Sequence, residues 1–382
     1  MDDAGSRGLL RPFENLPDPR AHNIVHPLFN ILLITIMAVT CGAPDWQSVS
    51  QWGKAKRKGL ATFLDLSTGI PSRDTFRRLF AALNPDAFER CFLTWTAELV
   101  RSSGGRLIAL DGKTLRRSFQ SAGGKAAIHR VSAWCQQNHV VLGQLAVADK
   151  SNEITAIPKL LELLDIQGAT VSIDAMGCQK EIARQIVDQQ GDYVLAVKDN
   201  HKTLHEDVRF FLDEAIAQDD PHLTKLEKPL VEADHGRLET RRLWASHEVG
   251  WLREQGHAWA GLRGIVCAEG ERHTFADGKT TIERRYYLTS HDPRKMGAAK
   301  LLEMVRGHWG IENKLHWCLD MSFQEDRRRL RQGQGAENFS RLCRLALNLL
   351  KSERTLKVGI ATKRLNCGWD HDYLLKVLMN LG

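Results

Sequence analysis

The sequence predicts a mixed α/β fold, in which a mixed sheet is flanked by helices, preceded by a helical domain and interrupted by a β-rich insertion. Three observations indicate it. Residues 1–100 show the apolar spacing of helices, residues 106–225 show short apolar runs that come to alternate with helical patterns, and residues 226–291 are again rich in strand patterns. Strands that alternate with helices are typical of a sheet covered by helices.

The first 100 residues are expected to form several helices. The apolar stretch 27–41 predicts one buried helix, because it is shorter than a comfortable membrane span. Ser72 is expected to cap a later helix, and Pro85 to divide that region into two helices. The composition of 101–106 is that of a linker.

The middle of the chain predicts the sheet and its covering helices. Strands are expected at 106–113, in "AIHRVSAWCQ", in "HVVLGQLAVAD", at 169–177 and in "YVLAVKD", and helices are expected at 155–165, in "QKEIARQIVDQQG" and in "KTLHEDVRFFLDEAI". Helical patterns return at 294–322 and 336–353. We therefore predict four parts, namely a helical domain (1–100), a first core part (106–225), a β-rich insertion (226–291) and C-terminal helices completing the core (292–382).

The composition restricts the classes of protein to which the chain can belong. The chain has 382 residues, of which 43% are hydrophobic and 26% charged, as in globular proteins. Its formal net charge of +7 favours a polyanionic partner. Its eight cysteines include no C-x-x-C pair, which favours reduced thiols in a cytosolic protein over a zinc ribbon or a disulfide framework. The polar start of the chain predicts no signal peptide.

Two acids follow apolar strand patterns. Asp111 closes "LIALD" and Asp174 closes "VSID". Ligands bind at strand ends in such sheets, and the glycines that follow, Gly112 and Gly177, are expected to leave room for a ligand. The alternative is two separate turn acids, since Asp is common after strands.

A third acid, Glu312, lies in "RGHWGIENKLHWCLDMSFQED" (306–326). At about 100° per residue, a helix through this stretch places Glu312 on the flank of an apolar stripe, between His308 and His316. The stripe consists of Ile311, Leu315, Cys318 and Leu319, and its tryptophans are also expected to pack. The acids at 325–326 are expected at the surface.

Three converging carboxylates are the ligands that divalent cations such as Mg²⁺ prefer, and Mn²⁺ is expected to substitute. Two ions roughly 3.5–4 Å apart can clamp a phosphodiester for in-line displacement. Without metal, the clustered carboxylates would raise one another's pKa values. A catalytic role for Asp111, Asp174 and Glu312 therefore predicts metal dependence.

Several ordered motifs resemble the H-repeat-associated transposases of bacterial insertion sequences. They are "LIALDGKTLRRS", "VSIDAMGCQKEIA", "DYVLAVKDNH", "HGRLETRR" and the stretch 306–326, with "DPRAHNIVHPL", "PSRDTFRRLF" and "GWDHDYLLKVL" towards the ends. The resemblance covers nearly the whole chain. It implies an RNase H-like catalytic core and a DDE triad, which falls on Asp111, Asp174 and Glu312.

The resemblance also implies the activity. Such a protein binds terminal inverted repeats, hydrolyses DNA at the ends of its element with two Mg²⁺ ions, and joins the freed 3′-hydroxyls to target DNA. It implies double-stranded DNA as partner, a homodimer when DNA-bound, a bacterial cytoplasmic location at the nucleoid, and no membrane. Wider relatives carry Tyr-x2-Arg-x3-Glu-x6-Lys around the third acid, where this chain has Val305, His308 and Leu319. Whether a hairpin intermediate is used stays open.

Several basic side chains are candidates for DNA contacts, although charge runs are usually solvated surface. They are Lys113, Arg116 and Arg117 after the first acid, His235, Arg237 and Arg241 on one face of a strand, and His308 and His316 beside Glu312. Glu239, on that same strand face, is the reserve for the third acid. Trp134, Trp309 and Trp317 are expected in the core, and the alternative is that they stack on an unpaired base.

The sequence supports other functions less well. A zinc site on His308, Glu312 and His316 is disfavoured, because the spacing is not His-Glu-x-x-His. No phosphate-binding Gly-Lys loop and no Gly-x-Ser-x-Gly elbow occurs. Two alternatives remain, a catalytically inactive or regulatory DNA-binding relic and a metal-dependent nuclease of other specificity.

Overall fold

The computed structural model describes residues 11–22, 24–100, 106–114, 129–147, 153–234, 236–330 and 332–379. Contacts divide the chain into two compact units. Unit 1 comprises Met1–Ser103, Gly112–Asn152 and Glu312–Gly382, and unit 2 comprises Gly104–Asp111 and Glu153–Ile311. The division into four consecutive parts stays a prediction, and most of the predicted linker (101–105) lies outside the described residues.

The N-terminal part of unit 1 is helical, as predicted. The Ser72 hydroxyl accepts a hydrogen bond from the Thr75 N–H (3.2 Å), and the Asn84 side chain accepts one from the Ala87 N–H (3.0 Å). Pro85 therefore begins a new helix, as predicted. After a 3-10 turn (Arg11–Phe13) the helices are α2 (Leu28–Thr40), α3 (Trp46–Ala55), α4 (Arg57–Leu60), α5 (Arg73–Ala82) and α6 (Pro85–Val100).

Helix α14 (Gly335–Ser352) organises unit 1. It is buried along most of its length and contacts α2, α5, α6 and strand β3 (Val140–Val147). Two asparagines on α14 bind the backbone of these neighbours. Asn338 donates to the carbonyls of Phe80 and Leu83, both at 2.9 Å, and Asn348 bonds both backbone groups of Val141. These bonds satisfy buried amide donors that would otherwise cost free energy.

Strand β2 (His129–Cys135) pairs antiparallel with β3, forming the predicted hairpin of unit 1. The register shifts between Ala133 and Trp134, which marks a β-bulge. In the connecting turn His139 adopts a left-handed conformation with φ of 58°. The unit ends with α13 (Trp317–Met321), a 3-10 turn (Glu325–Arg327), α14, α15 (Ile360–Trp369) and α16 (His371–Met379).

Unit 1 buries charged side chains. Glu325 is 5% exposed, so its predicted surface position is wrong. Arginines from β2 and α14 surround it: Arg344 lies 2.8 Å and Arg130 3.6 Å from the Glu325 carboxylate. A charge is tolerated inside a protein only when such partners compensate it.

One sheet runs through unit 2. Its strands follow the order β1-β4-β5-β10-β9-β8-β6, and β7 pairs with β8. β1, β4 and β5 are parallel, and β10 joins β5 antiparallel, so the β-rich segment extends the sheet. The strands are β1 (Leu107–Thr114, in unit 2 to Asp111), β4 (Thr170–Ile173), β5 (Asp192–Val197), β6 (Thr224–Lys225), β7 (Leu230–Asp234), β8 (Arg237–Ser246), β9 (Gly264–Thr274) and β10 (Thr280–Thr289).

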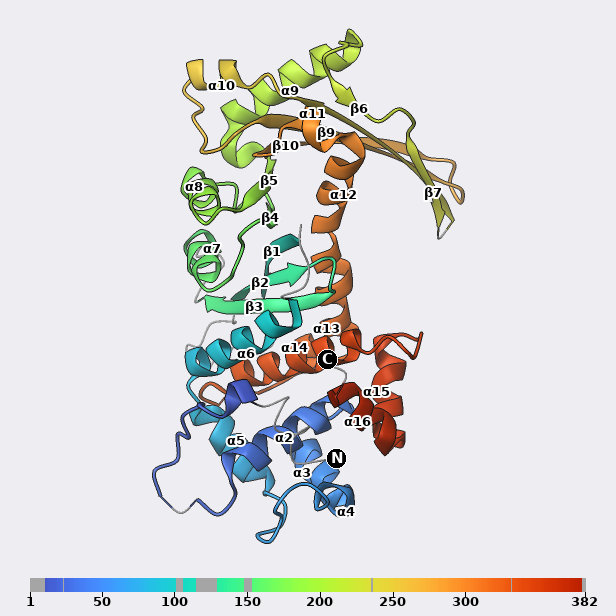
Figure 1. The fold of residues 1–382 in the computed structure, drawn as a ribbon. Coiled ribbons are helices and arrows are strands. Elements are labelled where there is room, and N and C mark those ends of the chain that lie inside the picture. The colour runs from blue at the N-terminus through green and yellow to red at the C-terminus, as the bar shows by residue number, and fades with distance from the viewer. Residues whose placement is uncertain are drawn as a thin grey trace. The chain divides into compact units, whose positions relative to one another are not determined.

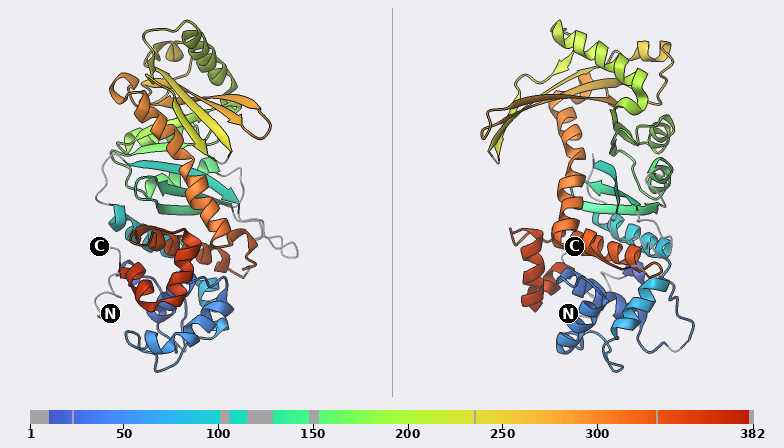
Figure 2. Two further views of the ribbon diagram at one scale, coloured as in Figure 1. Left: turned by 90° about the vertical axis from the view of Figure 1, so that its right-hand side faces the viewer. Right: turned by 180° about the vertical axis from the view of Figure 1, so that it is seen from behind.

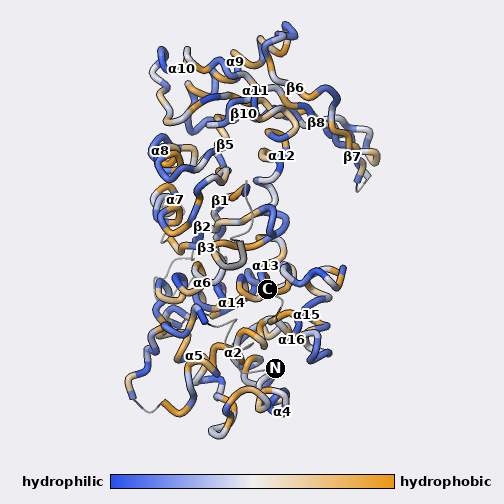
Figure 3. The backbone as a smooth tube through the Cα atoms, in the orientation of Figure 1, coloured by the Kyte–Doolittle hydropathy of each residue, from blue (hydrophilic) through white to orange (hydrophobic). Residues whose placement is uncertain are grey.

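Helices cover both faces of this sheet. Figure 1 shows α7 (Glu153–Glu162) and α8 (Lys180–Asp188) on one face and α12 (Ala298–His308) on the other, and both views of Figure 2 show α12 running along its face. Both α7 and α8 carry hydrophobic and hydrophilic residues, as Figure 3 shows, and α8 buries Ile182, Ala183 and Ile186. The other helices are α9 (Lys202–Ala217), α10 (Gly250–Glu254) and α11 (Pro293–Met296), with a 3-10 turn at Asp199–His201.

Helix α12 is fixed to the sheet by an apolar core. Leu301, Leu302 and Val305 pack with Leu107 of β1 and Val194 of β5. The predicted fold class is confirmed as mixed α/β, with a helical N-terminal region and a mixed sheet flanked by helices. Among the helices that the structure describes, none has both the length and the apolar composition needed to cross a membrane.

The helix predicted across 306–326 is not uniform. After α12 the chain forms a π-helix (Ile311–His316) and then α13. The uniform α-helical spacing is therefore wrong here, because a π-turn bonds residue i to i+5 and rotates the side chains that follow. The predicted apolar stripe is nevertheless buried. Its members Ile311, Leu315, Cys318 and Leu319 are at most 7% exposed.

The three tryptophans singled out from the sequence differ in exposure. Trp134 is fully buried, as expected, but Trp309 and Trp317 are 41% and 59% exposed, so their prediction as core residues is wrong. Trp309 is contacted by a cation. The Arg285 guanidinium lies over the indole, 4.2 Å from the ring centroid.

Candidate active site

The pairing of the parallel strands β1 and β4 places Asp111 beside Asp174. Asp174 directly follows the end of β4, as predicted, but β1 continues past Asp111 to Thr114, so the prediction that Asp111 ends its strand is wrong. Leu110 lies opposite Ile173 in this pair, and each aspartate is the next residue of its chain. Neighbouring strands lie about 4.8 Å apart, and residues at equal register project from the same face. The two carboxylates therefore start from adjacent backbone positions of unit 2. Both side chains are partly exposed.

The segment after β4 is held by hydrogen bonds. The Gly177 N–H donates to the Asp174 carboxylate (3.3 Å). Two side chains that follow β5 donate to backbone carbonyls in the same segment: Asn200 to Ala175, and His201 to Cys178 (2.6 Å). These contacts restrict the backbone around Asp174. The sequence analysis did not identify either donor, because they lie more than twenty residues further along the chain.

Gly177 serves packing. A Cβ atom at this position would lie 2.3 Å from the Ile173 Cγ2 atom and 2.7 Å from the Ile157 Cδ1 atom. The expectation that Gly177 leaves room for a ligand is wrong, because these isoleucine side chains occupy the space. For Gly112 the expectation stays a prediction.

We expect Gly177→Ala to lower the free energy of unfolding by about 1–3 kcal/mol, because the new methyl overpacks Ile173 and Ile157. Gly250→Ala is the matched control in unit 2, since a Cβ there meets no atom within 4 Å. It should change stability by less than about 0.5 kcal/mol. Urea unfolding of both variants measures the difference. Equal stabilities would contradict the assigned packing role.

His308, the last residue of α12, lies close to Asp174. Its Nδ1 atom is 3.1 Å from the Ser172 hydroxyl oxygen. Ser172 precedes Asp174 by two residues, and alternate residues of a strand share a face. Burial lowers the pKa of His308, and the charge of Asp174 opposes part of this shift. His308 is therefore mainly neutral at pH 7. A role for Ser172 was not predicted from the sequence, because its partner His308 lies 136 residues further along the chain.

Glu312 and His316 belong to unit 1, where both lie in the π-helix. The Glu312 side chain is exposed. π-turns often occur at functional sites, where they redirect single side chains. The role of Glu312 as the third acid stays a prediction. The zinc alternative loses its premise, because the spacing of His308, Glu312 and His316 required a regular α-helix.

Lys113 follows Asp111 by two residues and belongs to unit 1. Its ammonium group donates to the Asp320 carboxylate and lies 3.8 Å from that of Glu325. Burial raises the pKa of Asp320, and the bond from Lys113 offsets part of the effect. The charge of Lys113 is thus compensated within unit 1. Its predicted contact with DNA would require it to exchange these partners.

Strand β8 carries an ion-paired face in unit 2. Arg237, Glu239 and Arg241 share this face, as predicted, and Arg241 bonds both Glu239 and Glu232. The Glu239 carboxylate also lies 3.1 Å from a nitrogen of Arg272. The reserve candidate for the third acid is therefore surrounded by arginines. Three other predicted DNA contacts, Arg116, Arg117 and His235, lie outside the described residues.

The carboxylates of Asp111 and Asp174 suit a hard divalent cation. Asp111 and Asp174 offer carboxylate oxygens, the ligand type that Mg²⁺ and Mn²⁺ take, together with open positions for water or a phosphate oxygen. Within the described ranges, no group of three or more His, Cys, Asp or Glu side chains is arranged to hold a metal ion. The two aspartates would therefore supply two of the ligands, and water or phosphate oxygens would take the other positions.

Comparison with known proteins matches the chain to two family models. Residues 10–96 match a model described as DDE_Tnp_1-associated, and residues 102–349 match the transposase DDE domain. A Xanthobacter autotrophicus protein, described as an uncharacterized protein in the dhlA 3′ region, is 46% identical over 296 residues, 75% of this chain and 97% of that protein. The "H repeat-associated putative transposase YhhI" of Escherichia coli K12 is 36% identical over 383 residues, 98% of each chain.

A solved structure also resembles the chain distantly. It is the piggyBac transposase synaptic complex with hairpin DNA, which is 10% identical, with a TM-score of 0.40 over 99% of this chain and 77% of that one.

Proposed function

The chain belongs to the family of transposases with a DDE domain, and on this basis we propose that it is an active transposase of a bacterial insertion sequence. It binds double-stranded DNA at terminal inverted repeats, cleaves at the ends of the element, and joins the freed ends to target DNA. Because two ends must be brought together, it acts as a homodimer on DNA.

The observation that carries this proposal is the register of β1 and β4, which sets Asp111 and Asp174 side by side on neighbouring chains of the sheet. Two rigidly based carboxylates in one place create a concentrated negative charge that favours binding of a cation. Glu312, four residues after His308 in the chain, is proposed as the third acid. When bound, Mg²⁺ or Mn²⁺ would activate the attacking oxygen and stabilise the leaving oxygen.

The chain's own residues position the reaction. Asp111 and Asp174 are fixed by their strands, and Asp174 also by the Gly177 N–H. Neutral His308, held by Ser172, can exchange a hydrogen bond with a phosphate or with water beside Asp174. Water attacks phosphorus at the end of the element, and the bond from phosphorus to the 3′ oxygen breaks. The 3′ oxygen takes up the proton that the water releases. The resulting 3′-hydroxyl then attacks phosphorus of a target phosphodiester, where the bond to the target's 3′ oxygen breaks and this leaving oxygen takes up the hydroxyl proton.

The proposal predicts metal-dependent, end-specific cleavage. Labelled DNA with the two ends of the element, taken from its genomic flanks, is incubated with Mg²⁺, Mn²⁺ or EDTA, and the products are resolved on a denaturing gel. We expect cuts at the ends with either metal and none in EDTA. DNA with scrambled ends is the control. Binding without cutting would indicate an inactive DNA-binding relic, and cutting that ignores the ends would indicate a nuclease of other specificity.

A further inference from the structure

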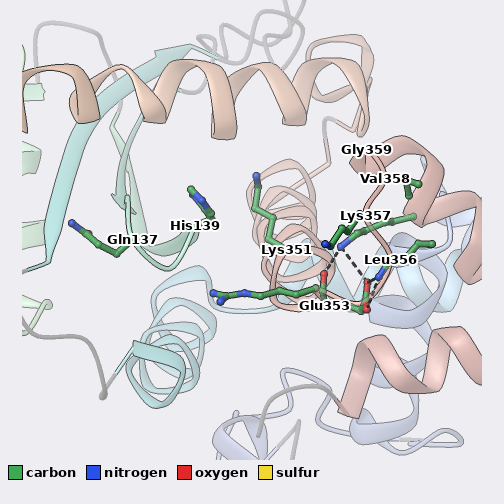
Figure 4. A pocket seen from close by; sticks show the side chains of 10 residues that line it. Gln137, His139, Lys351, Glu353, Leu356, Lys357, Val358 and Gly359 are labelled. Atoms are coloured by element: carbon green, nitrogen blue, oxygen red, sulfur yellow. Dashed lines mark hydrogen bonds and ion pairs between the residues drawn. The ribbon is translucent and has the colours of Figure 1, made fainter. Parts of the chain in front are cut away.

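An open pocket of about 640 Å³ lies in unit 1, between the β2–β3 turn and the segment that joins α14 to α15. His139 contributes from the turn, Lys351 from the end of α14, and Arg354 and Lys357 from the segment after it. Figure 4 shows His139 and Lys351 on neighbouring parts of its wall. Arg354 and Lys357 are exposed, and Lys351 is partly exposed.

Cations outnumber acids in this pocket. Among its lining residues Glu353 is the acid, and it is buried. Its carboxylate accepts hydrogen bonds from the Thr355 N–H (2.7 Å) and the Tyr373 hydroxyl (2.9 Å), and lies 3.2 Å from the Lys363 ammonium. Burial raises the pKa of Glu353, but these bonds outweigh the effect of burial and lower the pKa to about 2. Glu353 is thus ionised and compensated by Lys363.

The remaining cations have no such acid. Among the described residues, no ion pair joins Lys351, Arg354 or Lys357 to a carboxylate. The Lys351 ammonium lies over the Trp134 ring, 5.3 Å from its centroid, and this cation–π contact does not neutralise its charge. The pocket therefore presents net positive charge to solvent.

The cations also repel one another. Burial lowers the pKa of His139 to about 4, and the charges of Lys314, Lys351 and Arg354 lower it too. Burial likewise lowers the pKa of Lys351, and Lys314 adds to the shift. Clustering of like charges opposes folding, and an anion bound among them would relieve the repulsion.

Backbone groups add to this preference for anions. Gly359 lines the pocket and is the N-cap of α15, a helix whose first turn no side chain caps. The N-terminus of a helix carries partial positive charge and free N–H groups, which favour phosphate. The helix end and the lysine and arginine side chains thus face the same space.

We propose that this pocket of unit 1 binds the phosphate backbone of duplex DNA, as a site additional to Asp111 and Asp174. Separate exposed cations around an open pocket suit successive phosphates of a strand better than one enclosed small anion. That the anion is DNA rests on the proposed function, whereas its phosphate chemistry rests on the pocket itself.

The test compares two triple variants that lose the same charge. Lys351→Gln/Arg354→Gln/Lys357→Gln removes the pocket's cations. Lys225→Gln/Arg294→Gln/Lys300→Gln is the control, because each of these exposed cations already has an acid partner, in Asp219, Asp292 and Glu303. Fluorescence anisotropy with a labelled duplex of an element end, in EDTA and from about 50 to 200 mM salt, gives affinity and salt dependence.

We expect the pocket variant to bind at least about tenfold more weakly at low salt, with the slope of log K against log salt reduced by about 3. The control should stay within about twofold of wild type. Thermal unfolding of both variants at a temperature no lower than that of wild type would show that they are folded. Equal binding by the two variants, or no duplex binding by wild type, would overturn the proposal.

Competition by phosphate distinguishes a small anion from DNA as the ligand of the pocket. Comparison of DNA binding with DNA cleavage distinguishes the pocket from the proposed enzyme activity. Displacement of the duplex by inorganic phosphate at matched ionic strength would assign the pocket to a small free anion and overturn the proposal. The binding assay contains EDTA, so its outcome does not depend on cleavage. A chain that binds through the pocket but never cuts would refute the proposed enzyme and retain this site. Normal cleavage by the variant that lacks the pocket's cations would support the proposed enzyme and refute this site.

Discussion

Asp174→Asn is expected to slow metal-dependent DNA cleavage by at least about a thousandfold, a loss of about 4 kcal/mol of transition-state stabilisation. Asparagine keeps the size of the side chain and can still accept the Gly177 N–H, but it removes the negative charge and one anionic oxygen. Asp111→Asn should have a similar effect, because Asp111 lies beside Asp174 on the neighbouring strand β1.

The measurement separates chemistry from binding. Single-turnover cleavage with saturating enzyme gives the rate, and anisotropy in EDTA gives DNA affinity, which both variants should keep within about twofold of wild type. Asp165→Asn is a matched control in unit 2, since its side chain is 78% exposed, pairs with Arg106 at 3.8 Å and accepts a hydrogen bond from the Gln167 N–H (3.2 Å). A cleavage rate for Asp174→Asn close to that of this control would mean that the site lies elsewhere.

The third acid can be assigned with the same assay. Glu312→Gln should lower the rate as severely as Asp174→Asn. Glu239→Gln should leave cleavage nearly intact, because the carboxylate of Glu239 is engaged by Arg237, Arg241 and Arg272. Loss of activity in Glu239→Gln, with full activity in Glu312→Gln, would reverse the assignment.

Local patterns in the sequence predicted the elements that carry the aspartates. An apolar run that ends in an acid is a property of neighbouring residues, so the strands before Asp111 and Asp174 could be recognised. Their parallel register could not, because it depends on pairing between segments about sixty residues apart. The bond of Ser172 to His308 spans 136 residues and leaves no pattern in either segment.

Other features depend on packing that the sequence does not display. The π-turn at Ile311–His316 has the same apolar spacing as an ordinary helix, so nothing marked the change of register. Gly177 could not be distinguished from a ligand-facing glycine without knowing where Ile157 and Ile173 lie. The burial of Glu325 could not be recognised from its neighbours in the chain. Its partners Arg130 and Arg344 come from β2 and α14.

Glu325→Gln is expected to lower the free energy of unfolding by about 3–5 kcal/mol. The carboxylate accepts a hydrogen bond from Ser340 and lies 2.8 Å from Arg344, 3.6 Å from Arg130 and 3.8 Å from Lys113. Arg130 and Arg344 have side chains about 1% exposed, so the substitution leaves buried positive charge uncompensated. Urea unfolding at pH 7 measures the loss.

The pH dependence of the difference in unfolding free energy between wild type and Glu325→Gln tests whether the ionised carboxylate is its cause. Burial raises the pKa of Glu325, but the charges of Arg344, Lys113 and Arg130 outweigh the effect of burial. The pKa therefore lies well below the ordinary value of about 4.3. A carboxyl whose pKa is depressed in the folded state stabilises it fully above the pKa of the unfolded state. That stabilisation is lost as the pH falls from about 4.3 towards the depressed value.

The gap between wild type and Glu325→Gln should therefore be widest at neutral pH and narrow as the pH falls below about 4.3. Glu303→Gln provides the control, because Glu303 is 60% exposed and pairs with Lys300 at the surface. That variant should differ from wild type by less than about 1 kcal/mol at every pH. If Glu325→Gln is as stable as this control at pH 7, the arginines are not held by the carboxylate, and the buried network does not stabilise unit 1.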